Sequence, residues 1–199
     1  MKTPTPTPTL PKQESVQLTY TDGEKIERAA LGLPACEPAP TGLIRRMPKG
    51  RTPVRKKAIA APEVLNEACE YGSAFVRGLR VELPGGITQL LISGTASVGP
   101  NGETLYPGDF RAQLWRTYHN ISRLLEAEGA TWQDIVRTTC YLRDIERDYA
   151  EFNAIRNEFF RALGLNPFPA STAIQARICR SDLLVEIEAV AYLIRPEAA

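Results

Sequence analysis

The segment LLVEIEAVAYL, which runs from Leu183 to Leu193, decides the fold of this chain. Side chains of a β-strand alternate between its two faces. The alternation puts Glu186 and Glu188 on one face, and the other face is apolar throughout, with Leu183, Val185, Ile187, Ala189, Ala191 and Leu193. The pattern predicts a strand whose apolar face lies in a core. A carboxylate kept from water needs a partner or a task, so the second face is either solvated or part of a site.

Strand-like and helix-like patterns alternate along the chain after Cys69. We expect strands at 74–83, 88–98, 135–142, 171–179 and 185–194. We expect amphipathic helices at 109–128 and 146–163. The order predicts an α/β (α+β) fold with a single mixed β-sheet and two helices on one face, and it leaves room for a further strand earlier in the chain. The other face then needs a cover, which association of several copies would supply.

The first third of the chain differs in composition from the rest. Ten of the 16 prolines fall within the first 62 residues, and proline removes the backbone donors that helices and sheets need. We therefore divide the chain into a Pro-rich, basic, largely irregular extension at 1–65 and a folded domain at 66–199. Within the extension, the sequence TDGE at Thr21–Glu24 predicts a turn.

Basic residues gather at the end of the extension. Seven basic residues and no acidic residue lie between Pro38 and Pro62, namely Arg45, Arg46, Lys49, Arg51, Arg55, Lys56 and Lys57. Such an arm either contacts RNA or another anionic partner, or lies over a neighbouring subunit. Because no aromatic side chains interleave with the charges, we do not expect nucleic-acid binding.

Composition excludes several classes of protein. The chain carries 24 basic and 23 acidic residues, so its net charge of +1 favours neither nucleic acid nor an acidic membrane. No apolar run approaches the roughly 20 residues of a membrane span, and the N-terminus lacks the apolar core of a secretion signal, so we expect a cytoplasmic protein. A single histidine and four scattered cysteines without a CxxC pair predict no metal site, and the absence of a Gly-rich phosphate loop predicts no cofactor.

Several separated motifs resemble the RidA/YjgF superfamily. They occur in an unbroken order between Gly72 and Leu193, as SGTASVGPNGET, GDFRAQLWRTYHNISRLLEAEGATWQDIVRTTCYLRDI, FNAIRNEFF, PFPAS and VEIEAVA. The resemblance implies a chorismate-mutase-like domain. It also implies a homotrimer in which three sheets form a barrel, with a ligand cleft at each subunit interface and a small anionic metabolite as ligand.

The resemblance also implies a chemistry. Deaminases of this superfamily hydrolyse reactive enamines and imines, and an arginine directly after the residues PA clamps the substrate carboxylate. In this chain that position is Ser171. The glutamate that follows 15 residues later in the family pattern is present as Glu186.

A second resemblance concerns the C-terminal half of the chorismatases. The stretches that carry it are YGSAFVRG, LLISGTASV, YPGDFRAQLWRTYHNI and PASTAIQARIC. Chorismatases remove the enolpyruvyl group of chorismate with a glutamate on the last strand as the acid, and some carry a cysteine seven residues earlier. Cys179 has that spacing from Glu186. Chorismatases also have an N-terminal half, for which residues 1–70 are too short.

These patterns give a set of candidate site residues. Glu186 is the candidate acid, because burial in a cleft raises a carboxyl pKa toward neutral pH; otherwise it pairs with an arginine across the trimer. Arg177 would replace the missing anion contact, unless it is exposed or paired with Glu188. The other candidates for substrate binding are Ser171 and Cys179 on the same strand face as Arg177, Ser93, Gly94 and Thr95 at a turn after a strand, and the aromatic residues Tyr71 and Phe75.

Three functions are compatible with these residues. The first is a small-molecule enzyme that protonates an enol ether or enamine at an intersubunit cleft. Its most specific version is a chorismatase-like lyase or hydrolase. The second is an imine or enamine deaminase whose carboxylate-binding group has moved. The third is a non-catalytic, metabolite-binding regulatory protein.

Overall fold

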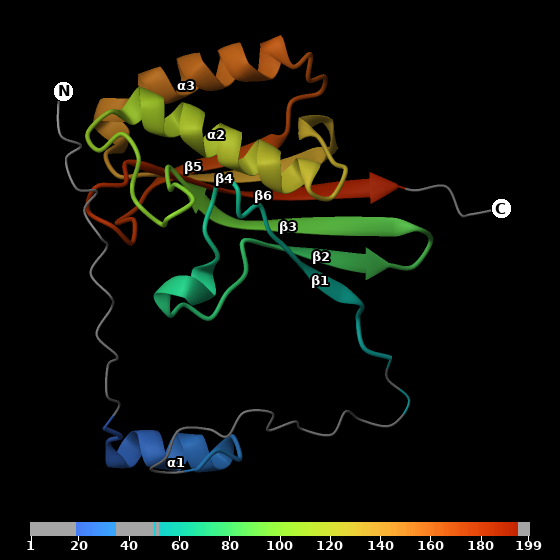
Figure 1. Ribbon diagram of the computed structural model, residues 1–199, viewed down its shortest axis with the longest axis vertical. Coiled ribbons are helices and arrows are strands. Elements are labelled where there is room, and N and C mark those ends of the chain that lie inside the picture. The colour runs from blue at the N-terminus through green and yellow to red at the C-terminus, as the bar shows by residue number, and fades with distance from the viewer. Residues whose placement is uncertain (1–18, 35–49, 51, 195–199) are drawn as a thin grey trace, which may run out of the picture. The chain divides into compact units, whose positions relative to one another are not determined.

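Six strands form one mixed sheet in the computed structural model (Figure 1), in the order β1-β2-β3-β6-β4-β5. The strands are β1 (Lys56–Ile59), β2 (Gly78–Leu83), β3 (Ile87–Ala96), β4 (Ile135–Leu142), β5 (Ala170–Gln175) and β6 (Val185–Ile194). Only β4 and β5 are parallel; every other neighbouring pair is antiparallel. The mixed sheet is confirmed, and β1 is the further strand for which the sequence left room.

The structure describes residues 19–34, 50 and 52–194, and these fall into two compact units. One unit lies within Lys12–Pro53. The sheet belongs to the other unit, which includes the residues from Val54 onward. Strand β1 and the buried residues Ile59 and Leu65 contribute to the core of the sheet unit. Four residues of the basic arm (Arg45, Arg46, Lys49 and Arg51) lie outside the described residues, whereas Lys56 and Lys57 form part of β1.

Two long helices, α2 (Phe110–Glu126) and α3 (Ile145–Ala162), lie on the same side of the sheet in Figure 1. Each begins after an aspartate whose carboxylate accepts a backbone N–H of the first turn: Asp109 accepts from Ala112, and Asp144 accepts from Arg147. The two helices and their placement on one face of the sheet agree with the sequence pattern.

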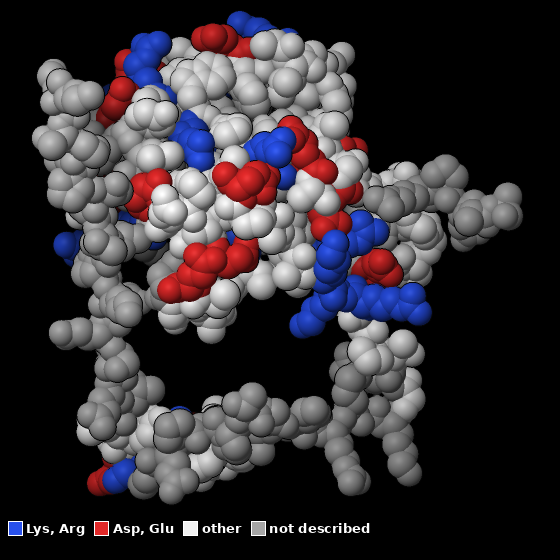
Figure 2. Space-filling model, viewed as in Figure 1, with Lys and Arg blue, Asp and Glu red and all other residues white. Residues whose placement is uncertain are grey.

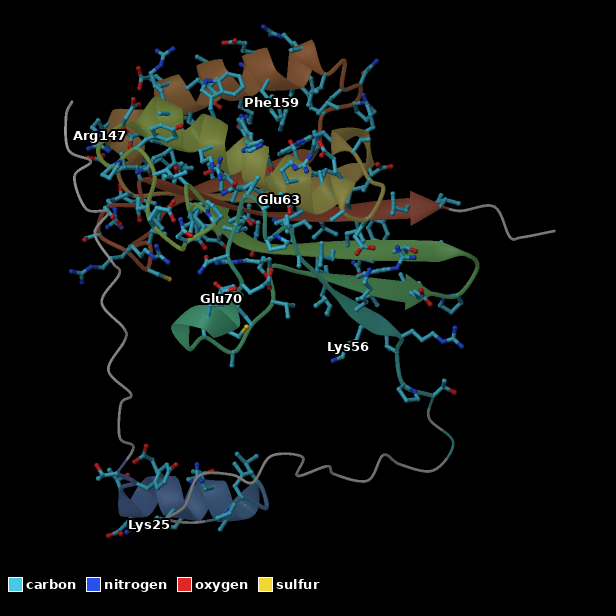
Figure 3. The ribbon with its side chains drawn as sticks, viewed as in Figure 1. Lys25, Lys56, Glu63, Glu70, Arg147 and Phe159 are labelled. Carbon is cyan, nitrogen blue, oxygen red and sulfur yellow. The ribbon has the colours of Figure 1, made fainter. Side chains whose placement is uncertain are left out.

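Aromatic side chains join the two helices. Phe159 of α3 lies between α3 and α2 in Figure 3, and its ring stacks on Tyr118 of α2 with the ring centroids 4.5 Å apart. Trp132, in the short helix η2 (Trp132–Asp134), packs edge-on against both rings, and its Nε1–H donates to Ser122 Oγ at 2.8 Å. Edge-on and stacked aromatic contacts add to the free energy gained by burial alone.

The sequence TDGE at Thr21–Glu24 is not a turn, which corrects the expectation from sequence. It opens helix α1 (Asp22–Ala30), with Thr21 as the N-cap. The Thr21 hydroxyl accepts from the Glu24 N–H, and the Glu24 carboxylate accepts from the Thr21 N–H. This reciprocal pair is a capping box, and the T-x-x-E spacing favours a helix start over a free turn.

Glu128 connects the end of α2 to the first two strands. Its buried carboxylate pairs with Arg80 Nη1 of β2 at 3.2 Å and with Lys57 Nζ of β1 at 3.3 Å. Glu128 therefore neutralises positive charge that strands β1 and β2 bring close to the core. Elsewhere on the visible face of the unit that contains the sheet, Figure 2 shows basic and acidic side chains mixed together rather than separated by sign.

We expect Glu128→Ala to lower the free energy of unfolding by roughly 3 kcal/mol, because it leaves the half-buried guanidinium of Arg80 with only the more distant carboxylate of Glu82, 3.7 Å away. Urea denaturation followed by circular dichroism measures the change. The matched control is Glu63→Ala, whose pair with Arg123 is exposed on both sides and should be worth less than about 1 kcal/mol. Equal losses in the two variants would show that Glu128 has no special structural role.

Candidate functional site

The two carboxylates of β6 lie on the face of the sheet that the helices do not cover. Val185, Ile187 and Ala189 are buried on the helix side, so the alternating residues Glu186 and Glu188 point to the opposite, open face, where both are half-buried. This face is therefore neither core nor freely solvated surface.

A β-bulge in β3 lies directly beside these carboxylates. The pairing of β3 with β6 shifts between Ile92 and Thr95, so Ser93 and Gly94 together oppose Glu188. The sequence placed Ser93, Gly94 and Thr95 at a turn after a strand; the structure corrects this to a bulge inside a continuous strand. Thr95 pairs with Ile187 and is buried on the helix side, so it does not face the carboxylates.

Gly94 lets the backbone of β3 approach the carboxylate of Glu186. A Cβ atom at this position would lie 2.0 Å from Glu186 Oε1, which is shorter than any van der Waals contact. Ser93 is held in place by its hydroxyl, which donates to the Val76 carbonyl at 2.7 Å. The structure thus brings together Gly94 and Glu186, which the sequence named separately.

Arg77 is a member of this group that the sequence did not single out. It is 4% exposed, and its guanidinium donates from Nε to the Asn66 carbonyl at 2.7 Å and from Nη2 to Asn66 Oδ1 at 2.9 Å. Its charge acts on Glu186, and its Cζ lies 5.5 Å from the ring centroid of Phe75. The signal in the sequence is a single charge inside the apolar run FVRGL.

The surroundings of Glu186 favour its neutral form. Burial raises the pKa of the Glu186 carboxyl, the negative charge of Glu188 raises it further, and Arg77 opposes both effects. Tyr141 of β4 pairs with Glu186 across the sheet. Burial, the charge of Glu188 and a hydrogen bond to Glu188 raise the pKa of the Tyr141 hydroxyl. The cluster can therefore hold one carboxylic acid, one carboxylate and a tyrosine O–H donor on the same surface.

A hollow of about 460 Å³ opens on this face, a size that suits a small ligand. Its lining is mainly apolar and includes Phe75, Leu79, Leu91, Ser93, Glu188 and Val190. Two of the candidate residues, Phe75 and Ser93, thus line the hollow, and Glu188 supplies a carboxylate at its wall. Tyr71 is the last residue of the short helix η1 (Ala68–Tyr71), which precedes this segment.

Ser171 lies on the other face of the sheet from Glu186. It pairs with Thr138 of β4, whose hydroxyl donates to Ser171 Oγ at 3.0 Å, and Thr138 is buried under the helices. Arg156 of α3 donates from Nη1 to the same Ser171 Oγ at 3.2 Å. Within one chain, Ser171 and Glu186 therefore do not share a site.

Arg177 and Cys179 do not lie on a strand. Strand β5 ends at Gln175, where its partner β4 also ends at Leu142, and the expected strand at 171–179 is thus shortened. Both residues are exposed in the loop that follows. Arg143 shapes this loop by donating to the carbonyls of Leu183, Ile178 and Arg180.

Neither a metal site nor a membrane span occurs in the described part of the chain. Among residues 19–34, 50 and 52–194, no three His, Cys, Asp or Glu side chains are grouped so that they could hold a metal ion. No helix within these ranges is long and apolar enough to cross a bilayer. The chemistry on the open face is that of the carboxylates, Tyr141 and Arg77.

Comparisons with known proteins place this arrangement in a family. Residues 85–193 match the family model described as Endoribonuclease L-PSP. The chain is 34% identical over 103 residues to the 2-iminobutanoate/2-iminopropanoate deaminase of Escherichia coli K12, covering 51% of this chain and 77% of that protein. It is 32% identical over 103 residues to a RutC family protein of Pyrococcus abyssi, covering 52% and 77%.

Solved structures agree with these relatives. The YjgF gene product of E. coli superposes with a TM-score of 0.56 at 31% sequence identity, covering 68% of this chain and 97% of that one. E. coli TdcF with bound serine gives a TM-score of 0.57 at 26% identity, covering 70% and 99%. The matched family model spans the bulge of β3, the polar face of β6 and both covering helices, and the chain belongs to the RidA/YjgF superfamily.

Proposed function

We propose that this chain is an imine or enamine deaminase that hydrolyses a small 2-imino acid, with Glu186 as the acid. The observation that carries the proposal is the half-buried carboxyl of Glu186 on the open face, whose raised pKa suits it to hold a proton. The identity of 34% to a 2-iminobutanoate/2-iminopropanoate deaminase supports the reaction class.

The proposed reaction needs a proton and a water molecule. An enamine takes a proton at carbon to become an iminium ion. Water then adds to the C=N carbon to give a carbinolamine, and a proton passes from the new hydroxyl to the nitrogen, so that ammonia leaves as a 2-oxo acid forms. A neutral Glu186 carboxyl supplies the proton, and the resulting carboxylate takes one back from the attacking water, so the group ends as it began. Tyr141, whose O–H is oriented by Glu188, lies close enough in the sheet to assist.

We therefore prefer an imine or enamine deaminase to the chorismatase-like enzyme that the sequence placed first. The relatives reported above support a deaminase, and none of their names points to chorismate. Cys179, whose spacing from Glu186 motivated the chorismatase resemblance, is exposed in the loop after β5 rather than on the strand beside Glu186.

We expect Glu186→Gln to reduce imine hydrolysis roughly 100-fold, because the amide cannot donate and recover a proton. The imine is generated in place by oxidation of alanine with an amino-acid oxidase, and semicarbazide traps whatever the deaminase leaves. Glu158→Gln, an exposed change on α3, is the control and should keep full activity. The proposal fails if Glu186→Gln stays within about threefold of the wild type, or if chorismate rather than the imine is turned over.

The raised pKa of Glu186 also predicts a pH dependence of stability. The pKa in the folded state exceeds the ordinary value of 4.5, so ionisation costs more in the folded than in the unfolded protein. Stability from this group is complete below pH 4.5 and is lost as the pH rises through the folded pKa. Glu186→Gln removes that loss: its melting temperature should match the wild type near pH 4 and exceed it at pH 7.

Melting curves of both proteins between pH 4 and pH 8 test this expectation. Glu158→Gln serves again as the control, and its difference from the wild type should not grow with pH. A Glu186→Gln protein that is less stable than the wild type at pH 7 would show that the Glu186 carboxylate, rather than the acid, is the stabilising form.

A further inference from the structure

Arg156 of α3 reaches the edge of the sheet on the helix side. Its Nη2 donates to Asn153 Oδ1 at 2.6 Å and its Nη1 to Ser171 Oγ at 3.2 Å. The guanidinium also lies over the ring of Phe152, with Cζ 4.9 Å from the centroid. The side chain is thus fixed in one orientation by two hydrogen bonds and an aromatic face, all of them from uncharged groups.

No carboxylate lies within ion-pair distance of Arg156 among the described residues. The half-buried Arg80 differs in this respect, because it pairs with the Glu128 carboxylate at 3.2 Å. Arg156 is half-buried, so part of its hydration is lost without an opposite charge to compensate. A guanidinium held in this way is ready to bind an anion. Neutral contacts already fix its orientation, so binding costs little further conformational entropy.

Further hydrogen-bonding groups lie around this guanidinium. Ser171 Oγ accepts from Thr138, and the buried thiol of Cys140 lies 3.9 Å from both hydroxyl oxygens. Tyr118 is 2% exposed, and its hydroxyl has no hydrogen-bond partner among the described residues. Burial and Cys140 raise the pKa of this hydroxyl, and the charge of Arg156 opposes the rise. A buried O–H donor without an acceptor is a second, independent sign of an incomplete polar site.

The site is open at the edge of the sheet. Strand β5 is the edge strand of the sheet, and Ser171 is exposed on it. A ligand can therefore reach Arg156 without moving the core. A planar carboxylate matches the paired N–H donors of a guanidinium.

We propose that Arg156, together with Ser171, binds the carboxylate of a small 2-oxo or 2-imino acid. The identity of the ligand rests on the proposed function, whereas the anion site rests on the contacts of Arg156. Because the sheet separates Arg156 from the Glu186 of the same chain, an imino acid held here would be protonated by the Glu186 of another copy.

The experiment measures binding of pyruvate, the 2-oxo acid product of 2-iminopropanoate, by isothermal titration calorimetry at low salt. Arg156→Gln should weaken binding roughly tenfold or more, because one charge-assisted contact is lost. Arg156→Lys keeps the charge but not the paired donors, so its loss should be smaller. Arg161→Gln, an exposed arginine of the same helix, and Arg137→Gln, whose side chain bonds Thr172 on the open face, should both bind as the wild type does.

The outcomes separate this inference from the proposed function. Pyruvate binding by Arg156→Gln within about twofold of the wild type, or no binding by the wild type, overturns the anion site even if Glu186 is essential for turnover. Loss of binding in Arg156→Gln but not in Arg161→Gln supports it even if no imine is hydrolysed. A greater loss of pyruvate binding in Arg137→Gln than in Arg156→Gln would place the carboxylate on the open face and would also overturn the inference.

Discussion

Strand β6 is hydrogen-bonded on both sides, to β3 and to β4, and its two-residue alternation sets the two faces of the sheet. The apolar side of this strand packs under α2, and the two carboxylates of the candidate site lie on the opposite side. A shift of β6 by one residue against its neighbours would exchange the two faces and bury both carboxylates under the helices. The cost of burying two charges without partners is what makes this register unique.

The same alternation creates the chemistry of the open face. Glu186 and Glu188 are two residues apart, so their charges lie on one surface and disfavour double ionisation. Gly94 brings the backbone of β3 against the Glu186 carboxylate, and Tyr141 donates to Glu188. The positive charge of buried Arg77 limits the rise in the pKa of Glu186. Burial, the negative charge of Glu188 and the positive charge of Arg77 together set the pKa of Glu186.

Local patterns predicted most of the fold. The bounds of β4 and β6 agree with the expectation from sequence, because β6 alternates without a break and β4 alternates from Thr138 to its end. The strand at 171–179 is shorter than expected, because a strand cannot continue where its hydrogen-bonding partner ends. The turn expected at Thr21–Glu24 is a helix start, since capping there outweighs the turn preference of its residues.

The sequence by itself determined the order of strands and helices, the polar face of β6, the family and the candidates Glu186 and Gly94. Only the tertiary structure decided that Ser93 and Gly94 form a bulge, that Arg77 acts on Glu186, that Ser171 lies on the other face, and that Arg156 meets it there. These are contacts between residues on different elements. They depend on strand register and on how a helix crosses the sheet, and neither is encoded in the spacing of residues along a single segment.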